Sequence, residues 1–259
     1  MSQFERLISI MKKLRSEGGC PWDREQTHES LRPYLIEEAY EVLDAIDAKD
    51  DDELRVELGD LLLQVVFHAQ LASEDGRFAI EDVSEAVSDK LVRRHPHVFS
   101  DAVAETSKQV LTNWENIKKE EHGDKRKSIL DGLPRHLPAL LKAFRIQEKV
   151  SRVNFDWDEV SDVFSKVREE MAELEQAFEA RSQKQLEEEF GDLMFSMVNL
   201  ARHLKITPED ALRASNEKFT SRFGYIEEQM DARGEDLSDT TLERLDVLWD
   251  EAKALEKRD

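Results

Sequence analysis

The side chains with the clearest chemical potential in this sequence are carboxylates that recur in one spacing, E-x-x-E, fifteen residues, then E-x-x-D. The pattern occurs twice, and its members are Glu38, Glu41, Glu57 and Asp60, then Glu170, Glu173, Glu189 and Asp192. Residues three apart share one helix face, so the carboxylates of each pair point the same way. Gathered carboxylates repel one another unless they take up protons or bind cations. Hard divalent ions prefer oxygen ligands, which makes Mg2+ the expected ion and Mn2+ a substitute.

The spacing also predicts how two helices bring the four carboxylates of each copy together. In an antiparallel helical hairpin, residues at equal chain distance from the turn lie side by side. Residue 49 lies midway between Glu41 and Glu57, and also midway between Glu38 and Asp60. Residue 181 is the corresponding midpoint in the second copy.

Gly59 and Gly191 lie inside these helices, where glycine costs about 1 kcal/mol relative to alanine. Such a glycine indicates a close approach by another helix or by a ligand.

A solvated acidic helix face is the simpler explanation, because Asp and Glu total 58 residues and E-x-x-E arises easily by chance. The identical spacing of the two copies favours the metal site, as does the Gly-Asp-apolar sequence that continues each copy. Duplication of a purely structural hairpin would repeat the pattern as well, so both interpretations stay open.

Cationic and aromatic side chains recur one helical turn apart. The pairs are Lys90 and Arg94, Lys218 and Arg222, and Trp249 and Lys253. Two cations beside a metal-binding acidic cluster suit a polyphosphate, and tryptophan can stack on a base. Surface salt bridges and a core tryptophan are the alternatives for these residues.

The composition limits the class of protein. Charged residues make up 37% of 259 residues, against about 25% in a typical soluble protein. Gly (9) and Pro (6), which break helices, are scarce. Both features favour long helices. The net charge of −21 argues against a free-standing nucleic-acid binder. The single cysteine, Cys20, excludes an internal disulfide and fits a cytoplasmic protein. No apolar stretch is long enough for a membrane span.

A shift of 132 residues superimposes the chain on itself. Segment 36–41 falls on 168–173, and 57–61 falls on 189–193 without a gap. Small further shifts extend the pairing to Trp22 with Trp157, Lys90 with Lys218, Arg94 with Arg222, Trp114 with Trp249 and Lys118 with Lys253. Two copies of about 120 residues predict two similar domains, 1–130 and 131–259. The boundary follows from the charged run at 118–127 and the Gly and Pro residues after it.

Apolar residues within each copy recur at three- and four-residue steps, which predicts helices. The predicted helices include 52–71, 160–180 and 183–204. A later helix is predicted to begin at Pro208, with Thr207 as its N-cap. No convincing strand pattern is present, so the predicted fold is all-α with two tandem helical repeats.

Several motifs together resemble the MazG family of nucleoside triphosphate pyrophosphohydrolases. They are Gly18-Gly19-Cys20-Pro21-Trp22-Asp23, Glu37-Glu38-x-x-Glu41, Glu57-Leu58-Gly59-Asp60 and Asn216-Glu217-Lys218-Phe219-x-x-Arg222-Phe223. The resemblance covers nearly the whole chain. It implies an all-α fold with a four-helix core per active unit, a homodimer, Mg2+ dependence and hydrolysis of nucleoside triphosphates between the α- and β-phosphates.

The resemblance also implies roles for single residues and makes the C-terminal copy the principal active site. The implied metal ligands are Glu170, Glu173, Glu189 and Asp192, with Glu38, Glu41, Glu57 and Asp60 as a second, less certain set. The implied substrate contacts are Lys166, Lys218, Arg222, Trp249 and Lys253, and Glu169 is the implied base that activates water. In the N-terminal copy Ser88 replaces Asn216 and Tyr34 replaces Lys166, which puts its catalysis in doubt but not its capacity for metal.

The expected mechanism is attack on the polyphosphate by a water whose pKa the metal lowers. Lys218 and Arg222 would offset the charge that builds in the transition state. Two other functions fit the same residues. One is a related metal-dependent enzyme for a nucleotide such as dUTP or a deoxycytidine triphosphate. The other is a non-catalytic acidic scaffold that binds partner proteins.

Overall fold

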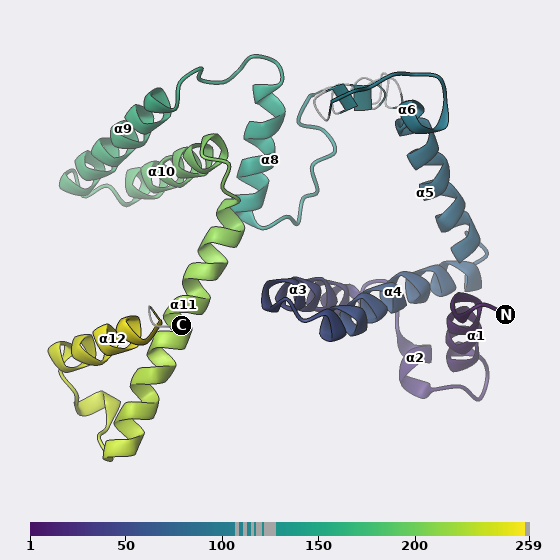
Figure 1. Ribbon diagram of the computed structural model, residues 1–259, viewed down its shortest axis with the longest axis horizontal. Helices are drawn as coiled ribbons and strands as arrows, with labels where there is room; N and C mark the ends of the chain where they lie inside the picture. Colours follow the sequence, from purple (N-terminus) through teal and green to yellow (C-terminus); the bar gives the residue numbers. More distant parts are fainter. Residues whose placement is uncertain (107–108, 111–112, 115–116, 118–120, 122–127, 257–259) are drawn as a thin grey trace. The chain divides into compact units, whose positions relative to one another are not determined.

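The computed structural model describes residues 1–259 apart from 107–108, 111–112, 115–116, 118–120, 122–127 and 257–259. Within this described part of the chain the regular elements are helices, and no strand occurs (Figure 1). The predicted all-α fold is therefore confirmed. A search of the described helices finds none long and apolar enough to cross a membrane.

The chain divides into two compact units, Met1–Gly123 and Asp124–Asp259, against a predicted boundary at residue 130. Most of the charged run at 118–127, including Lys118, lies outside the described residues. The first unit contains α1 (Gln3–Arg15), α2 (Pro21–Glu25), α3 (Arg32–Ala48), α4 (Asp51–Glu74), α5 (Ile80–Arg94) and α6 (Pro96–Phe99). The second contains α8 (Ala139–Ser151), α9 (Val160–Glu179), α10 (Gln183–His203), α11 (Pro208–Arg233), the 3-10 turn η2 (Leu237–Asp239) and α12 (Leu242–Glu256).

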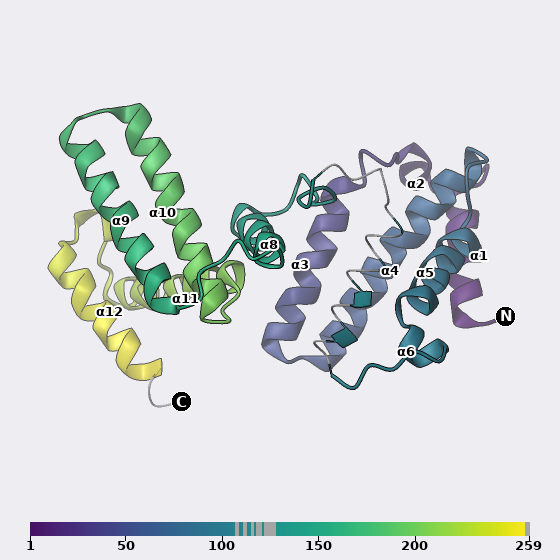
Figure 2. The same cartoon turned by 90° about the horizontal axis from the view of Figure 1, so that it is seen from above.

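Helices α3 and α4 form the hairpin of the first unit (Figure 2). The turn falls where the carboxylate spacing places it, because Lys49 ends α3 in the left-handed region with φ of 54°. Asp50 then caps α4, since its Oδ1 accepts hydrogen bonds from the backbone N–H groups of Asp52 and Glu53 at 3.0 Å. Helix α4 is longer at both ends than the predicted 52–71.

The core of the first unit lies between α1, α4 and the start of α5. Its buried side chains are Met11, Leu31, Val66, Phe67, Ala69, Leu71 and Ile80. Four of these residues come from the C-terminal half of α4, and the others come from α1, from the N-cap of α3 and from the start of α5, so this core packs the C-terminal half of α4 against α1 and α5.

Helices α9 and α10 repeat this hairpin in the second unit, side by side in both views (Figures 1 and 2). Arg181, the predicted midpoint, has φ of 55°, and Ser182 caps α10 by accepting a hydrogen bond from the Gln185 N–H. Each helix ends one residue before its predicted end. The two hairpins therefore confirm the pairing that the carboxylate spacing predicts.

Helix α8 packs against α10 and α11, and α12 packs against α11. Helix α11 begins at Pro208, as predicted, but the side chain of Thr207 makes no capping hydrogen bond, so this residue is an N-cap by backbone position alone. Ile226, Met230 and Leu248 form the buried contact that joins α12 to α11.

Gly59 and Gly191 face open space within the chain. A Cβ atom built at either residue would have no neighbour within 4 Å. The close approach by another helix that these glycines predict is not made by the described residues. Packing among the described residues therefore does not offset the cost of glycine inside α4 and α10.

Candidate metal and nucleotide site

The C-terminal hairpin gathers the predicted metal ligands into one cluster. Carboxylate oxygens of Glu170 on α9, and of Glu189 and Asp192 on α10, all lie within 4.8 Å of one another. A second group at the same place joins Glu169, Glu170 and Glu173 within the same limit. Glu170 belongs to both groups and is buried, with 5% of its surface exposed. The antiparallel pairing of α9 and α10 thus brings together carboxylates 19 and 22 residues apart in sequence, as predicted.

The carboxylates of this cluster carry negative charge that neighbouring side chains do not fully neutralise. Burial raises the pKa of Glu189, and the neighbouring carboxylates Glu173, Asp192 and Glu170 raise it further. A raised carboxyl pKa means that the ionised form is unfavourable where it stands. A cation bound among these oxygens would remove the penalty.

Lys166 supplies a positive charge at this cluster. Its Nζ lies 2.6 Å from Glu170 Oε1 and 2.7 Å from Glu169 Oε1, one turn earlier on α9. The hydrogen bonds to Glu169 and Glu170 raise the pKa of Lys166, so the ammonium stays charged. Both residues that the family resemblance adds to the site, Lys166 and Glu169, therefore lie at the cluster.

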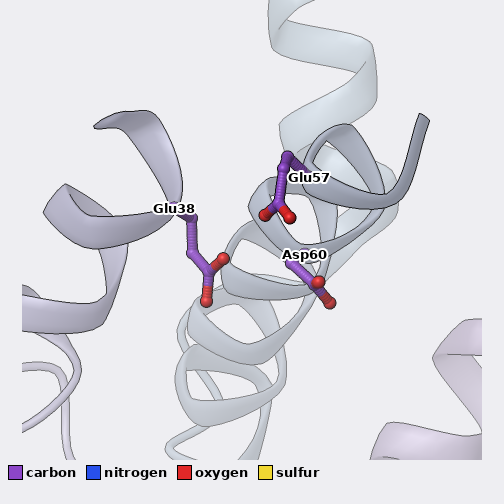
Figure 3. Close-up of side chains that lie close together, drawn as sticks. All are labelled: Glu38, Glu57 and Asp60. Atoms are coloured by element: carbon purple, nitrogen blue, oxygen red, sulfur yellow. The ribbon is translucent and has the colours of Figure 1, made fainter. Parts of the chain in front are cut away.

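The N-terminal hairpin forms a matching group from Glu38 on α3 and Glu57 and Asp60 on α4, with oxygens within 4.8 Å of one another. Figure 3 shows Glu38 extending toward the helix that carries the other two. Burial first, and then the charges of Asp60 and Glu41, raise the pKa of Glu38; burial and Glu41 likewise raise the pKa of Glu57. Glu41 thus acts on the cluster through its charge, although its oxygens are not part of the close trio.

Gln64 contacts the N-terminal cluster. Its Nε2 donates to Glu38 Oε1 at 3.4 Å, while its Oε1 is buried without a partner among the described residues. Tyr34 stands where the second copy has Lys166, and its ring contacts Trp22 edge-on with centroids 5.8 Å apart. The N-terminal cluster therefore keeps the carboxylates but has an aromatic ring in place of the ammonium.

The predicted substrate contacts on α11 and α12 lie together but apart from the acidic cluster. Arg222 binds Glu256 at 2.9 and 2.6 Å and lies over the ring of Trp249, 5.3 Å from its centroid. Trp249 also contacts Phe219 at 5.1 Å. Lys253 pairs with Asp250, and the charge of Lys218 lowers the pKa of Glu256, after the larger effect of Arg222. Among the described residues these contacts stay on α11 and α12, which extend away from the α9–α10 hairpin (Figure 1).

The same arrangement occurs in the first unit. Arg94, the repeat counterpart of Arg222, binds Glu121 Oε2 at 2.6 Å, as Arg222 binds Glu256 Oε2 at 2.6 Å. The internal repeat thus extends from the carboxylate hairpins to this ion pair. Lys118, the counterpart of Lys253, is outside the described residues.

A pocket that no sequence motif predicts adjoins the C-terminal cluster. Its volume is about 320 Å3, and Lys166, Glu170 and Asp192 line it beside residues of α8 and the 155–157 segment. Of its lining residues, Lys166, Glu170 and Asp192 belong to the predicted site, and Trp157 is the repeat counterpart of Trp22. Gln147 and Asn199, both buried in its wall, carry no motif that could have found them.

Comparison with known proteins places these features in a family. The MazG nucleotide pyrophosphohydrolase domain matches the chain twice, at residues 26–99 and 159–225, which contain the two hairpins. A Thermotoga maritima protein called nucleoside triphosphate pyrophosphohydrolase/pyrophosphatase MazG is 52% identical over 96% of this chain and 95% of its own. An Escherichia coli K12 nucleoside triphosphate pyrophosphohydrolase is 51% identical over 99% of both chains. The Bacillus subtilis protein YabN is 50% identical over 99% of this chain and 53% of its own. The double domain match and these full-length similarities show that the chain belongs to the MazG family.

Proposed function

We propose that this protein is a Mg2+-dependent enzyme that hydrolyses nucleoside triphosphates, ATP among them, to nucleoside monophosphate and pyrophosphate at its C-terminal hairpin. The observation that carries this proposal is the group of Glu170, Glu189 and Asp192 oxygens within 4.8 Å, with the Lys166 ammonium beside it. The names of the Thermotoga maritima and Escherichia coli relatives support the substrate class and the products.

The side chains present fit a hard divalent cation. They offer carboxylate oxygens from two facing helices, and the raised pKa of Glu189 reflects negative charge in need of a counter-ion. Glu170, Glu173, Glu189 and Asp192 would hold Mg2+, with Mn2+ as a substitute. Bound there, the ion would neutralise phosphate charge and lower the pKa of a water.

Side chains of the protein itself carry out the proton transfer and stabilise the phosphate charge. Glu169 is exposed at the edge of the cluster, where it accepts the proton of the attacking water once Lys166 has left it. Lys166 passes from the two carboxylates to a phosphate oxygen, because the incoming polyphosphate is a strong anion and a cation bound at the cluster would neutralise Glu170 in its place. Lys218 and Arg222 stabilise the negative charge on the polyphosphate. Trp249 and Lys253 are further contacts to the substrate.

A second copy of the chain completes the site in this proposal. Among the described residues Arg222 pairs with Glu256 on α12 and lies over the ring of Trp249, so a homodimer is the simplest way to bring these side chains to an acidic cluster. The hairpin also leaves large apolar side chains exposed, notably Phe178 (71%) and Phe190 (57%), which a partner would cover. One free cysteine and the charge of −21 suit a cytoplasmic enzyme that does not bind nucleic acid.

The test is a rate comparison between the two clusters. Glu170→Gln and the matched variant Glu38→Gln each remove one charge from equivalent positions of the two hairpins. Initial rates of pyrophosphate release from ATP, CTP, GTP and UTP with Mg2+ should fall at least about a hundredfold in Glu170→Gln and less than about threefold in Glu38→Gln. Equal rates in both variants and the wild type would refute the assignment to the C-terminal hairpin.

A further inference from the structure

Two side chains of α12 hold the guanidinium of Arg222. Arg222 Nε donates to Glu256 Oε1 at 2.9 Å, and Arg222 Nη2 donates to Glu256 Oε2 at 2.6 Å, so one carboxylate binds one edge of the guanidinium. The same guanidinium lies over the ring of Trp249, 5.3 Å from its centroid. Because one edge and one face are both in contact, the plane of the guanidinium is fixed.

The other edge of this guanidinium remains for a further ligand. A guanidinium has five N–H donors in a rigid fork, and Glu256 accepts from one on Nε and one on Nη2. Among the described residues, Nη1 of Arg222 makes no hydrogen bond. The edge formed by Nη1 and Nη2 matches two oxygens of a phosphate. Glu256 therefore leaves open the edge that a polyphosphate can bind.

The first unit has the same arrangement. Arg94 also uses its Nε and Nη2 edge, because these two atoms donate to Glu121 Oε2 at 3.0 and 2.6 Å. Glu121 follows Trp114 by seven residues, as Glu256 follows Trp249. Since the partners, their spacing and the edge of the guanidinium are the same in both copies, the ion pair belongs to the repeat and is not an incidental surface contact.

The packing of α12 on α11 does not require this ion pair. The buried side chains of Ile226, Met230 and Leu248 join the two helices, which lie side by side (Figure 1). Glu256 is the last residue of α12, about two helical turns beyond Leu248. Its side chain is more than a third exposed, and ion pairs of this kind contribute little to stability. The function of the pair is therefore to be sought at Arg222.

The charges around Glu256 support this view. A carboxylate in the last turn of a helix meets the negative end of the helix dipole, so α12 by itself disfavours Glu256. The hydrogen bonds from Arg222, and to a smaller extent the charge of Lys218, lower the pKa of Glu256, which keeps it ionised beside both cations. The interactions that favour this carboxylate thus come from the two predicted phosphate contacts on α11.

We propose that Glu256 is a positioning residue of the nucleotide site, which holds the Nε and Nη2 edge of Arg222 so that the edge with Nη1 is directed at the polyphosphate. Glu256 acts through Arg222 and does not itself touch the substrate. The inference rests on the proposed function, which assigns Arg222 to the polyphosphate. A guanidinium that is already oriented stabilises the transition state without having to reorganise during the reaction.

The first test is the steady-state kinetics of ATP hydrolysis with Mg2+. Glu256→Gln keeps the size of the side chain but turns an N–H group toward the guanidinium, so kcat/KM should fall about tenfold, mainly through kcat. Glu251→Gln is the matched control, because it removes the same charge from α12 at a residue that contacts Tyr225, and it should change kcat/KM less than about twofold. Unchanged kinetics in Glu256→Gln would overturn the inference. So would a lower KM, which is expected if Glu256 competes with the polyphosphate for Arg222.

A double-mutant cycle tests whether Glu256 acts through Arg222. Arg222→Lys keeps the positive charge but loses the planar fork that one carboxylate can orient. In the Arg222→Lys background, Glu256→Gln should lower kcat/KM by less than about a further twofold. A further tenfold loss would show that the carboxylate acts independently of Arg222, and it would overturn the inference. Failure of the proposed function is a separate result, because the wild type would then hydrolyse no nucleoside triphosphate.

Discussion

Lys166 Nζ lies 2.6 Å from Glu170 Oε1, so an ammonium group rests on the most buried carboxylate of the C-terminal cluster. A lysine one turn before a carboxylate is a common helical pair, but here it also neutralises part of a group that otherwise repels itself. The N-terminal cluster has Tyr34 at this position. The two hairpins therefore share their carboxylates and differ in the charge that faces them.

Lys166 and a metal ion compete for Glu170, which predicts a counterintuitive effect of removing the lysine. In the absence of nucleotide, Lys166→Met should tighten Mn2+ or Mg2+ binding about three- to tenfold, the worth of one partly buried charge-assisted hydrogen bond. Calorimetric titration measures this. Tyr34→Met is the matched change in the other hairpin and should have no effect, and unchanged or weaker metal binding in Lys166→Met would contradict the competition.

The raised pKa values of Glu38, Glu57 and Glu189 predict how the metal-free protein responds to pH. The folded state holds protons on these groups that the unfolded state has released above its ordinary carboxyl pKa of 4.5. The contribution of these groups to stability is therefore lost as pH rises through their raised pKa values. Thermal melts should show that Mg2+ raises the melting temperature more at pH 7.5 than at pH 5, and an equal rise at both would count against the clusters as its source.

A histidine pair predicts the opposite pH response at another place in the first unit. Arg77 donates to His28 Nε2 at 2.7 Å, so His28 Nδ1 carries the proton that it donates to His68 Nδ1 at 2.7 Å. Burial lowers the pKa of His68, as does the charge of His28, and the neutral ring is favoured in the folded state. The stability from this pair is full above the ordinary pKa of 6.5 and is lost as pH falls below it.

The matched variant for this pair is His68→Leu, because the second copy has Leu200 at the equivalent position. Chemical denaturation at pH 7.5 and pH 5.5 should show the wild type losing more stability on acidification than the variant. If both lose the same amount, the histidine pair does not titrate as the geometry requires.

Subunit mixing tests whether a second copy completes the site. Glu170→Gln and Arg222→Gln should each be inactive alone. After exchange of equal amounts, about one quarter of the sites of a symmetric dimer combine an intact cluster with an intact Arg222, so about a quarter of wild-type activity should return. No recovery, with exchange confirmed by mass spectrometry, would place both groups in one chain.

Much of the fold and of the acidic site follows from short-range regularities of the sequence. Helical periodicity predicts the helices, and the symmetric spacing about residues 49 and 181 predicts the two hairpins, whose turns have positive φ at Lys49 and Arg181. Helix pairing of this kind depends on residues close in the chain, so its register can be read from spacing alone.

The pocket could not be predicted in this way. Gln147 meets the Phe195 carbonyl across 48 residues, and Asp156 meets Arg202 across 46. Nothing in the spacing of these residues indicates which faces of α8 and α10 meet. For the same reason the spacing of Lys218 and Arg222 shows that they share a helix face, but not that this face lies away from the carboxylates. The open space at Gly59 and Gly191 likewise depends on packing that the sequence does not state.

Phosphorus NMR of ATP incubated with the protein and Mg2+ tests the central claim most directly. The proposed cleavage between the α- and β-phosphates predicts resonances of AMP and pyrophosphate in equal amounts, which a chelator prevents and added Mg2+ restores. Formation of a nucleoside diphosphate and orthophosphate would contradict this claim. Unchanged spectra for ATP and the other common nucleoside triphosphates would contradict it as well.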